Sequence, residues 1–306
     1  MRYLTYKSGE GNRLGSLQKG YILDVARVAG FGDMLELIKA GPEVWARVAV
    51  ELQAVNIEEL TKKGEAIPYQ EQLLVAPLSH PPKNIICLGR NYDREYYKNA
   101  EEKIAARGEV DKPPEFPVYF SKPATTIVGP FDPIPLDPQI TRQLDWEAEL
   151  GVIIGVGGRR IRHEQAMQHV FGYTVLNDLT ARDLQFRHGQ WFKGKGLDAS
   201  CPMGPVIVTP DELPAPLHIP IRLRLNGVIK QDGNTGQLIF DIPTIIADLS
   251  QTMTLEPGDI ISTGTPDGMG HFRKPPEYLQ VGDLMETEIE GIGLLRNQIV
   301  LDTAGG

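Results

Sequence analysis

Short apolar runs separated by turn-forming residues fill the chain after residue 84, and they constrain its fold more than any other feature. Examples are "NIICLG", "ELGVIIGV", "PVIVTP", "IRLRLNGVI", "GDIISTG" and "METEIEGIG". Gly, Pro, Asp and Asn stand between them, and the sequence holds 24 prolines and 32 glycines. Runs of this kind are typical of β-strands joined by turns. We therefore predict a mostly β fold with some α-helix, including helices near 163–170 and 243–253.

The first 75 residues have a different pattern. A strand-like start, "RYLTYKSG", is followed by apolar residues at helical spacing in 33–54, namely Leu35, Leu37, Ile38, Val44, Val48 and Leu52. This periodicity predicts helices packed on a small sheet. The segment "APLSHPPKN", 76–84, is rich in proline and predicts a boundary. We expect a small α+β N-terminal domain over 1–75 and a second domain over 84–303.

Composition narrows the partners and the compartment. The net charge is −9 and no dense Lys and Arg run occurs, which argues against nucleic-acid binding. Cys87 and Cys201 are too few for a disulfide framework and match no zinc motif, so a reducing compartment is expected. The chain start has no apolar signal core and no run is long enough to span a bilayer. We expect a cytoplasmic protein that does not enter membranes.

Charged residues interrupt one apolar stretch at alternate positions, in "LDWEAEL", 144–150. In a strand, Leu144, Trp146, Ala148 and Leu150 would face one way and Asp145, Glu147 and Glu149 the other. Like charges on one partly buried face repel strongly, so a positive partner should lie there. A solvent-exposed strand face is the alternative, and from this pattern alone the two are equally weighted.

Asp178 follows the apolar run "FGYTVL" and supplies a third carboxylate. With Glu147 and Glu149 it would form an oxygen-only ligand set, without histidine and without an EF-hand loop. Hard cations prefer such sets, so Mg²⁺, Mn²⁺ or Ca²⁺ is predicted rather than zinc or copper. Three protein ligands would leave open positions for water or a chelating substrate.

Seven ordered motifs resemble the fumarylacetoacetate hydrolase family. They are "CLGRNY" (87–92), "FSKP" (120–123), "DWEAELGVIIG" (145–155), "GYTVLNDLTARDLQ" (172–185), "GKGLDASCPMGP" (194–205), "LEPGDIISTGTPDGMG" (255–270) and "VGDLMETEIEGIGLLRN" (281–297). The resemblance runs from about residue 84 to 300. It implies a β-rich fold of packed sheets, a homodimer, and a metal held by Glu147, Glu149 and Asp178. Asp145 is not a ligand in the resemblance, and we expect it to pair with Arg182 or Arg142.

The resemblance also implies small 2-oxo acid substrates and positions for other site residues. Lys195 in "GKG" matches the family's lysine near the metal, with Lys193 as its rival and a surface lysine as the alternative. The remaining matched positions are substrate-binding ones, and they are Gln185, Gly264, Thr265, Pro266, Arg90 and Tyr92. The turn at Gly264 could hold a carboxylate through backbone N–H groups or be a plain tight turn. Arg90 and Tyr92 either reach the substrate's far carboxylate or anchor the end of a strand.

One departure from the family affects the expected reaction. The hydrolases carry a His and a Glu three residues apart after "GRNY", where this sequence has Glu95 and Lys98. The two residues either form a surface ion pair or act as a base and its partner, with Glu95 as the catalytic base. His188 is the histidine nearest a site motif, and a structural role is favoured for it over a catalytic one.

Three functions stay open from the sequence. The leading hypothesis is metal-dependent C–C bond hydrolysis of an acylpyruvate-like substrate, the family's usual chemistry. A decarboxylase or isomerase of 2-oxo or 2-hydroxymuconate-type diacids follows closely, because the missing His–Glu pair removes an obvious means of activating water. The third is a metal-binding homologue without turnover, which the intact set of Glu147, Glu149, Asp178 and Lys195 argues against.

Overall fold

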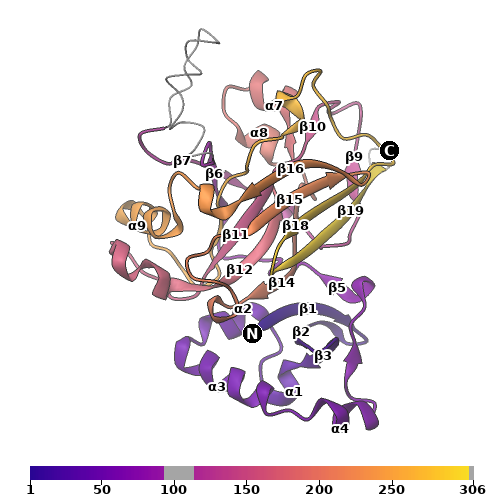
Figure 1. Cartoon of the computed structure of the whole chain (residues 1–306), viewed down its shortest axis with the longest axis vertical. Helices are drawn as coiled ribbons and strands as arrows, with labels where there is room; N and C mark the ends of the chain where they lie inside the picture. The colour runs from indigo at the N-terminus through magenta and orange to yellow at the C-terminus, as the bar shows by residue number, and fades with distance from the viewer. Residues whose placement is uncertain (93–113, 303–306) are drawn as a thin grey trace.

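A long mixed sheet forms the centre of the computed structural model, which describes residues 1–92 and 114–302 (Figure 1). Twelve strands from the described residues belong to it. Their spatial order is β4 (Ile67–Pro68), β3 (Tyr21–Asp24), β2 (Gly11–Gln18), β1 (Arg2–Ser8), β14 (Cys201–Val208), β12 (Val170–Asn177), β11 (Ala148–Ile154), β17 (Ile260–Ser262), β6 (Ile85–Gly89) and β7 (Val118–Lys122), with β5 (Leu74–Val75) beside β1 and β8 (Ile127–Val128) beside β14.

A second, five-stranded sheet packs against the part of the first sheet that contains β11. Its order is β16 (Val228–Asn234), β15 (Pro220–Leu225), β18 (Leu284–Ile289), β19 (Gly293–Leu301) and β9 (Ile134–Leu136). A short pair joins β10 (Leu144–Asp145) to β13 (Thr180–Ala181). Leu150 and Val152 of β11 share one buried cluster with Leu223 of β15 and Leu295 of β19. The predicted mostly β fold of packed sheets is confirmed.

The helices lie mainly at the N-terminal end and around the edges of the sheets (Figure 1). In residues 1–92 and 114–302 the α-helices are α1 (Val25–Ala29), α2 (Met34–Lys39), α3 (Pro42–Gln53), α4 (Ile57–Lys62), α7 (Arg182–Arg187), α8 (Phe192–Lys195) and α9 (Ile242–Thr252). The 3₁₀ turns are η1 (Glu71–Leu73), η2 (Ala124–Thr126), η3 (His163–His169), η4 (Pro210–Glu212), η5 (Thr235–Gln237) and η6 (Gly270–Phe272). The helical spacing in 33–54 and the helix expected at 243–253 correspond to α2, α3 and α9, whereas 163–170 is a 3₁₀ turn rather than an α-helix.

Side-chain caps explain where several helices begin. Asp33 accepts a hydrogen bond from the backbone N–H of Glu36 at the start of α2, and Asp241 does the same for Thr244 at the start of α9. Such caps satisfy N–H groups that have no partner within the helix. Pro42 occupies the first turn of α3, where a missing N–H carries no penalty.

The N-terminal segment covers the other face of the long sheet. Leu37 and Val48 from α2 and α3 share a buried cluster with Ile153 of β11 and Phe171 of β12. Strand β1 also joins the sheet directly, with Tyr3 paired to Ile207 of β14. Strands that precede and strands that follow the proline-rich segment 76–84 therefore belong to one sheet. The division into domains 1–75 and 84–303 stays a prediction.

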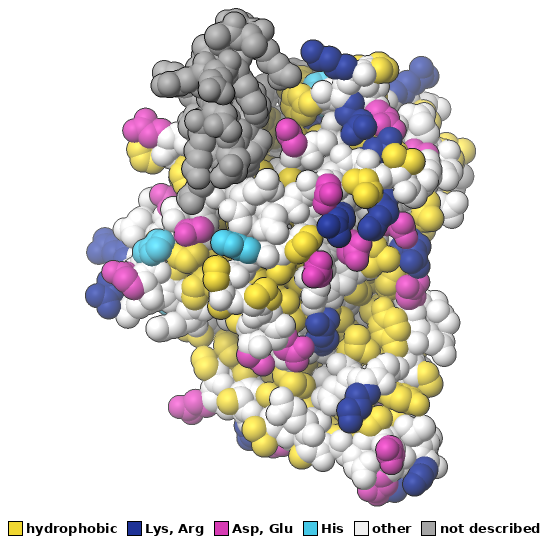
Figure 2. All heavy atoms as spheres, in the orientation of Figure 1, with side chains coloured by type: hydrophobic (Ala, Val, Ile, Leu, Met, Phe, Trp, Pro, Cys, Tyr) yellow, Lys and Arg dark blue, Asp and Glu magenta, His cyan; other side chains and the backbone are white. Residues whose placement is uncertain are grey.

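The surface carries charges of both signs. On the face shown in Figure 2, Lys and Arg side chains are interspersed with Asp and Glu rather than gathered in one patch. Within residues 1–92 and 114–302, the helices are all too short or too polar to cross a lipid bilayer.

Candidate metal centre

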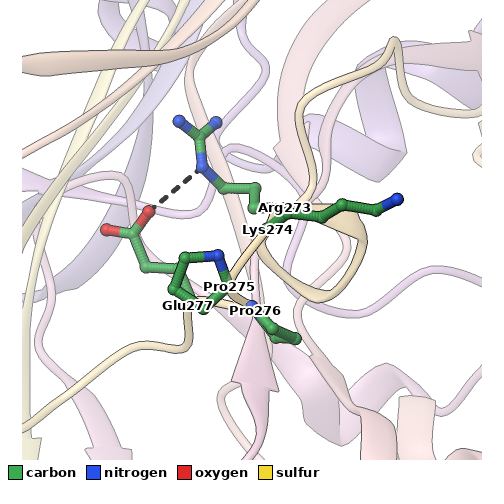
Figure 3. Close-up of a pocket in the computed structure, with 5 residues that line it drawn as sticks. All are labelled: Arg273, Lys274, Pro275, Pro276 and Glu277. Carbon is green, nitrogen blue, oxygen red and sulfur yellow. Dashed lines mark ion pairs between the residues drawn. The ribbon is translucent and has the colours of Figure 1, made fainter.

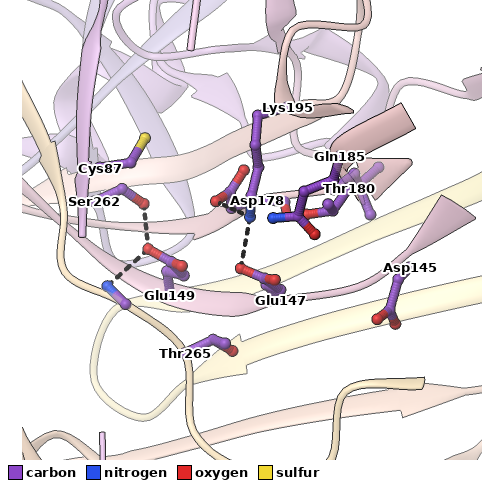
Figure 4. A network of polar contacts seen from close by, with 12 residues as sticks. Cys87, Asp145, Glu147, Glu149, Asp178, Thr180, Gln185, Lys195, Ser262 and Thr265 are labelled. Carbon is purple, nitrogen blue, oxygen red and sulfur yellow. Dashed lines mark hydrogen bonds and ion pairs between the residues drawn. The ribbon is translucent and has the colours of Figure 1, made fainter. Parts of the chain in front are cut away.

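Three carboxylates meet where two neighbouring strands of the long sheet come together. Glu149 lies on β11, Glu147 just precedes it, and Asp178 directly follows β12. The antiparallel pairing of β11 with β12 sets Ala148 opposite Asn177 and so brings the three residues together. One oxygen from each carboxylate lies within 4.8 Å of the others, and all three side chains are buried (Figure 4). The alternative of a solvent-exposed acidic strand face is therefore wrong.

The predicted continuous strand over 144–150 is also wrong, because it breaks at Trp146 and Glu147. The N–H of Trp146 donates to the carboxylate of Asp145 at 2.8 Å, and the N–H of Glu147 donates to the side-chain oxygen of Asn177 at 3.0 Å. These backbone groups bond to side chains instead of a strand ladder. Because of the break, the side chain of Glu147 need not follow the alternating directions of a continuous strand. Asp145 lies apart from Glu147 and Glu149 and points away from them (Figure 4).

Two cations bind Glu147 from the helices that follow β13. Lys195 Nζ on α8 lies 2.8 Å from Glu147 Oε2 and 2.6 Å from Asp178 Oδ2. Arg182 Nη2 on α7 lies 2.7 Å from Glu147 Oε1. Burial alone would lower the pKa of Lys195, but Asp178 and Glu147 outweigh burial and raise it, so the side chain is an ammonium ion at neutral pH.

Lys122 is a third cation, and the sequence patterns assign it no role although it lies in the motif "FSKP". It is fully buried at the end of β7, with Nζ 3.1 Å from Asp178 Oδ1. Its ammonium also donates to the carbonyls of Leu179 and Lys195 and to Ser200 Oγ. The sequence feature that could have indicated its role is the position of a lysine at the end of an apolar strand run. A lysine buried there requires an acidic partner.

The pKa values of Asp178 and Glu149 move in opposite directions. Burial alone would raise the pKa of Asp178, but Lys195 and Lys122 outweigh burial and hold that pKa below its usual value. Burial raises the pKa of Glu149 well above its usual value, and the charges of Asp178 and Glu147 raise it further. Glu149 Oε2 accepts hydrogen bonds from Ser262 Oγ at 2.6 Å and from the N–H of Gly264 at 2.8 Å.

Two oxygens of this cluster have properties expected of metal ligands. Glu149 Oε1 is buried and has no partner within the described part of the chain, whereas the buried Asp178 Oδ1 accepts no hydrogen bond there and has the ion pair with Lys122 at 3.1 Å. A buried carboxylate oxygen without a donor is costly unless a cation completes its environment. Carboxylate oxygens are the ligands that Mg²⁺, Mn²⁺ and Ca²⁺ prefer. The residues present therefore fit a divalent cation.

Asp145 pairs with Arg182 and not with Arg142. Arg182 Nε donates to Asp145 Oδ2 at 2.8 Å, whereas Arg142 Nε donates to the carbonyl of Pro138. Arg182 Nη1 also donates to the side-chain oxygen of Gln185 at 3.1 Å. Gln185, predicted to bind substrate, is thus buried beside the carboxylates and held by the same guanidinium.

The other residues predicted to bind substrate lie on the strand ends around the cluster. The N–H of Gly264 holds the protein's own Glu149, and Thr265 Oγ1 accepts a hydrogen bond from Gln231 at 2.8 Å. Arg90 follows β6 with a left-handed φ of 56°. Tyr92 is buried, and its hydroxyl has no hydrogen-bond partner in the described residues. Their roles toward substrate stay predictions.

The remaining candidates do not join the cluster. Lys193 and His188 are exposed, and Lys195 is the buried lysine of "GKG". Glu95 and Lys98 lie outside the described residues, so their predicted roles are untested.

A surface hollow of ≈ 590 Å³ is lined by Arg273, Lys274, Pro275, Pro276 and Glu277 (Figure 3), and it contains none of the predicted site residues.

Three buried carboxylates are flanked by three cations on a β-rich fold, and one of their oxygens, Glu149 Oε1, has no partner among the described residues. Such a site defines a protein able to bind a divalent metal ion. Residues 84–300 match the family model described as "Fumarylacetoacetate (FAA) hydrolase C-terminal". The chain belongs to the fumarylacetoacetate hydrolase family.

Two curated relatives carry the same activity in their names. "Oxaloacetate tautomerase YisK" of Bacillus subtilis is 47% identical over 229 residues, which is 75% of this chain and 73% of the relative. "Oxaloacetate tautomerase FAHD2A, mitochondrial" of Homo sapiens is 42% identical over 236 residues, 76% of this chain and 71% of the relative. These relatives support an enzymatic role for the chain.

Two solved structures share the fold over nearly the whole chain. The fumarylacetoacetate hydrolase EaFAH from Exiguobacterium antarcticum has a TM-score of 0.82 and 40% identity, and the match covers 99% of this chain and 100% of that one. The maleylpyruvate hydrolase from Sphingobium sp. SYK-6, solved with manganese(II) and pyruvate, has a TM-score of 0.75 and 31% identity at the same coverage.

Proposed function

We propose that this protein is a divalent-metal-dependent tautomerase that interconverts the keto and enol forms of a 2-oxo dicarboxylic acid of the oxaloacetate type. The observation that carries the proposal is the set of partners around Glu147, Glu149 and Asp178. These partners are lysine, arginine, serine and backbone N–H groups. All six histidines of the sequence are in the described residues, and none has a recorded contact with these carboxylates.

Such a site suits proton transfer better than hydrolysis. Keto–enol conversion removes one proton from the carbon next to the 2-oxo group and adds one to its oxygen, so it consumes no water. Histidine is the side chain most often used to activate water near neutral pH. The departure at Glu95 and Lys98 agrees with this preference, as do the names of the tautomerase relatives. C–C hydrolysis, the leading hypothesis from the sequence, becomes the second candidate, supported by the maleylpyruvate hydrolase neighbour.

Glu147, Glu149 and Asp178 would hold Mg²⁺ or Mn²⁺, with Ca²⁺ as a further possibility. When bound there, the cation would act as a Lewis acid that stabilises negative charge on the oxygen of an enolate. Within the described residues Glu149 Oε1 has no partner and Asp178 Oδ1 has the ion pair with Lys122, so these two oxygens would bind it.

Lys195 has the properties of a proton donor to the 2-oxo oxygen. Its ammonium lies between Glu147 and Asp178, 4.9 Å from the centre of the Phe120 ring, and is buried. A fixed, desolvated ammonium stabilises developing negative charge more strongly than one in water. Gln185 lies beside it and would orient the substrate, while Glu95 remains the candidate base.

The test is an ultraviolet assay of keto–enol equilibration of oxaloacetate with Mn²⁺ or Mg²⁺, run beside product analysis on acetylpyruvate and fumarylpyruvate. We expect tautomerase activity that a chelator abolishes. Lys195→Met should reduce kcat by roughly 10²-fold or more, as loss of a proton donor does. Lys193→Met is the matched control, since that lysine lies two positions away and is exposed. Cleavage of an acylpyruvate without tautomerase activity would refute the proposal in favour of hydrolysis.

Assembly and location remain predictions. A homodimer is expected, and light scattering on the purified protein would test it. A cytoplasmic location is expected as well, although the human relative is named as mitochondrial.

A further inference from the structure

Asp145 is a buried carboxylate that the metal-site proposal does not use. Its side chain is fully buried and all of its recorded partners are donors. Oδ1 accepts from the N–H groups of Trp146 at 2.8 Å and Gly270 at 2.7 Å. Oδ2 accepts from the N–H of His271 at 3.0 Å and from Arg182 Nε at 2.8 Å. With its lone pairs filled in this way, Asp145 is satisfied without a metal.

Arg182 connects Asp145 to the candidate site. Nε and Nη2 of its guanidinium both lie 2.8 Å from Asp145 Oδ2. Nη2 also donates to Glu147 Oε1 at 2.7 Å, and Nη1 donates to Gln185 Oε1 at 3.1 Å. The guanidinium is rigid and planar, so fixing one edge fixes the direction of the remaining N–H groups. The orientation of Asp145 therefore determines where Arg182 holds a candidate metal ligand and a candidate substrate-binding amide.

The loop that contains η6 is built around the same carboxylate. A Cβ atom at Gly270 would lie 2.8 Å from Asp145 Oδ1 and 2.0 Å from the carbonyl oxygen of Glu277. Any side chain at this position would therefore separate the loop from Asp145. The N–H of Glu277 also donates to the carbonyl of Gly270 at 2.9 Å, which closes the loop on itself.

We propose that Asp145 is a positioning residue that fixes the Arg182 guanidinium, and through it Glu147 and Gln185, in the geometry needed for metal and substrate binding. The inference rests on the proposed metal role of Glu147. Without the charge of Asp145, the Arg182 cation has Glu147 as its remaining acidic partner in the described structure. Arg182 then competes with a divalent cation for Glu147.

The test is calorimetric titration of the full-length protein with Mn²⁺. Asp145→Asn keeps the shape of the side chain but replaces one carboxylate oxygen with an NH₂ group. This group cannot accept the hydrogen bonds that the N–H donors around Asp145 offer on that side. We expect its Kd for Mn²⁺ to rise about 10- to 100-fold, as changes behind a metal ligand do. Asp183→Asn is the matched control. It neutralises the neighbouring carboxylate on α7, whose recorded partners are Thr141 and the N–H of Leu184, and it should leave the Kd unchanged.

A double-mutant cycle separates positioning from a general structural effect. If Asp145 acts through Arg182, Asp145→Asn should weaken Mn²⁺ binding no further in an Arg182→Met background. Should Asp145→Asn fail to fold, Arg182→Lys tests the same link, because a lysine cannot hold Asp145, Glu147 and Gln185 together and should weaken Mn²⁺ binding.

The outcomes separate this inference from the proposed function. Folded variants that bind Mn²⁺ as the wild type does, or effects of Asp145→Asn and Arg182→Met that simply multiply, would overturn the positioning role. Either result would leave the tautomerase proposal intact. Failure of the wild type itself to bind Mn²⁺ would overturn both.

Discussion

At the scale of single residues, the site depends on how each buried charge is compensated. The sequence predicted a positive partner for the acidic residues of "LDWEAEL", and the structure provides Lys195 and Arg182 there, while Lys122 pairs with Asp178. Lys195 could be found from its motif. Lys122 and its contact with Asp178 could not be found from spacing, because 56 positions of sequence separate the two residues (178 − 122).

Removal of Lys122 should destabilise the protein. Lys122→Met leaves Asp178 with one cation fewer and deprives Ser200 Oγ and the carbonyls of Leu179 and Lys195 of a buried donor. We expect the free energy of unfolding to fall by about 3–5 kcal/mol, the usual result of breaking one side of a buried ion pair. Urea denaturation measures this, with Lys193→Met as the exposed control. A loss below 1 kcal/mol, which is ordinary for a surface ion pair, would contradict the role given to Lys122.

At the scale of elements, period-two alternation was a good guide only in part. Leu144, Trp146, Ala148 and Leu150 do share one buried cluster, as alternation predicts. The strand nevertheless breaks at Trp146 and Glu147, because the side chains of Asp145 and Asn177 take their backbone N–H groups. Asn177 lies 30 positions from Glu147, so local pattern does not reveal the interruption.

The contact between α3 and the far end of β11 should stabilise the fold without affecting the metal centre. Trp45 on α3 packs edge-on against Phe171, with ring centres 5.0 Å apart. Its ring also packs so closely on Gly155 that a Cβ atom added there would lie 2.4 Å from the ring. Gly155 is six residues from Glu149, which is about 20 Å along a strand.

We therefore expect Trp45→Ala to lower the free energy of unfolding by about 3 kcal/mol and to leave the Kd for Mn²⁺ unchanged. Val50→Ala on the same helix is the control, because Val50 is 66% exposed and its truncation should cost less than about 0.5 kcal/mol. Weaker Mn²⁺ binding by folded Trp45→Ala would show that the N-terminal helices help to shape the site.

At the scale of the whole molecule, the buried carboxylates should make stability depend on pH when metal is absent. A carboxyl group with a raised folded-state pKa, such as Glu149, takes up a proton on folding. Its contribution to stability is fully present below the unfolded-state value near 4.5 and is lost as the pH rises through the folded-state pKa. Asp178 acts in the opposite sense. Its lowered pKa contributes stability above the usual value of 3.8, and that stability is lost only as the pH falls through the folded-state pKa.

In a chelating buffer, the free energy of unfolding should therefore fall with rising pH above pH ~5, by up to about 1.4 kcal/mol per pH unit from Glu149. Glu149→Gln should remove this part of the slope, and saturating Mg²⁺ should do so in the wild type, because the cation takes the place of the proton. Urea denaturation across the pH range measures both. Identical slopes for the wild type and Glu149→Gln in chelator would show that Glu149 is ionised in the folded, metal-free protein.

The sequence by itself determined the mostly β fold and which acidic residues could form a metal centre. Strand periodicity and turn residues are local, and a set of carboxylates without histidine restricts the cation whatever the fold. Only the tertiary structure decided how the charges are paired. It directs the N–H of Gly264 to Glu149, places Lys122 against Asp178, and turns Asp145 toward Arg182 and the loop at Gly270. These contacts join residues that are distant in sequence and depend on the packing of whole sheets, which no local pattern encodes.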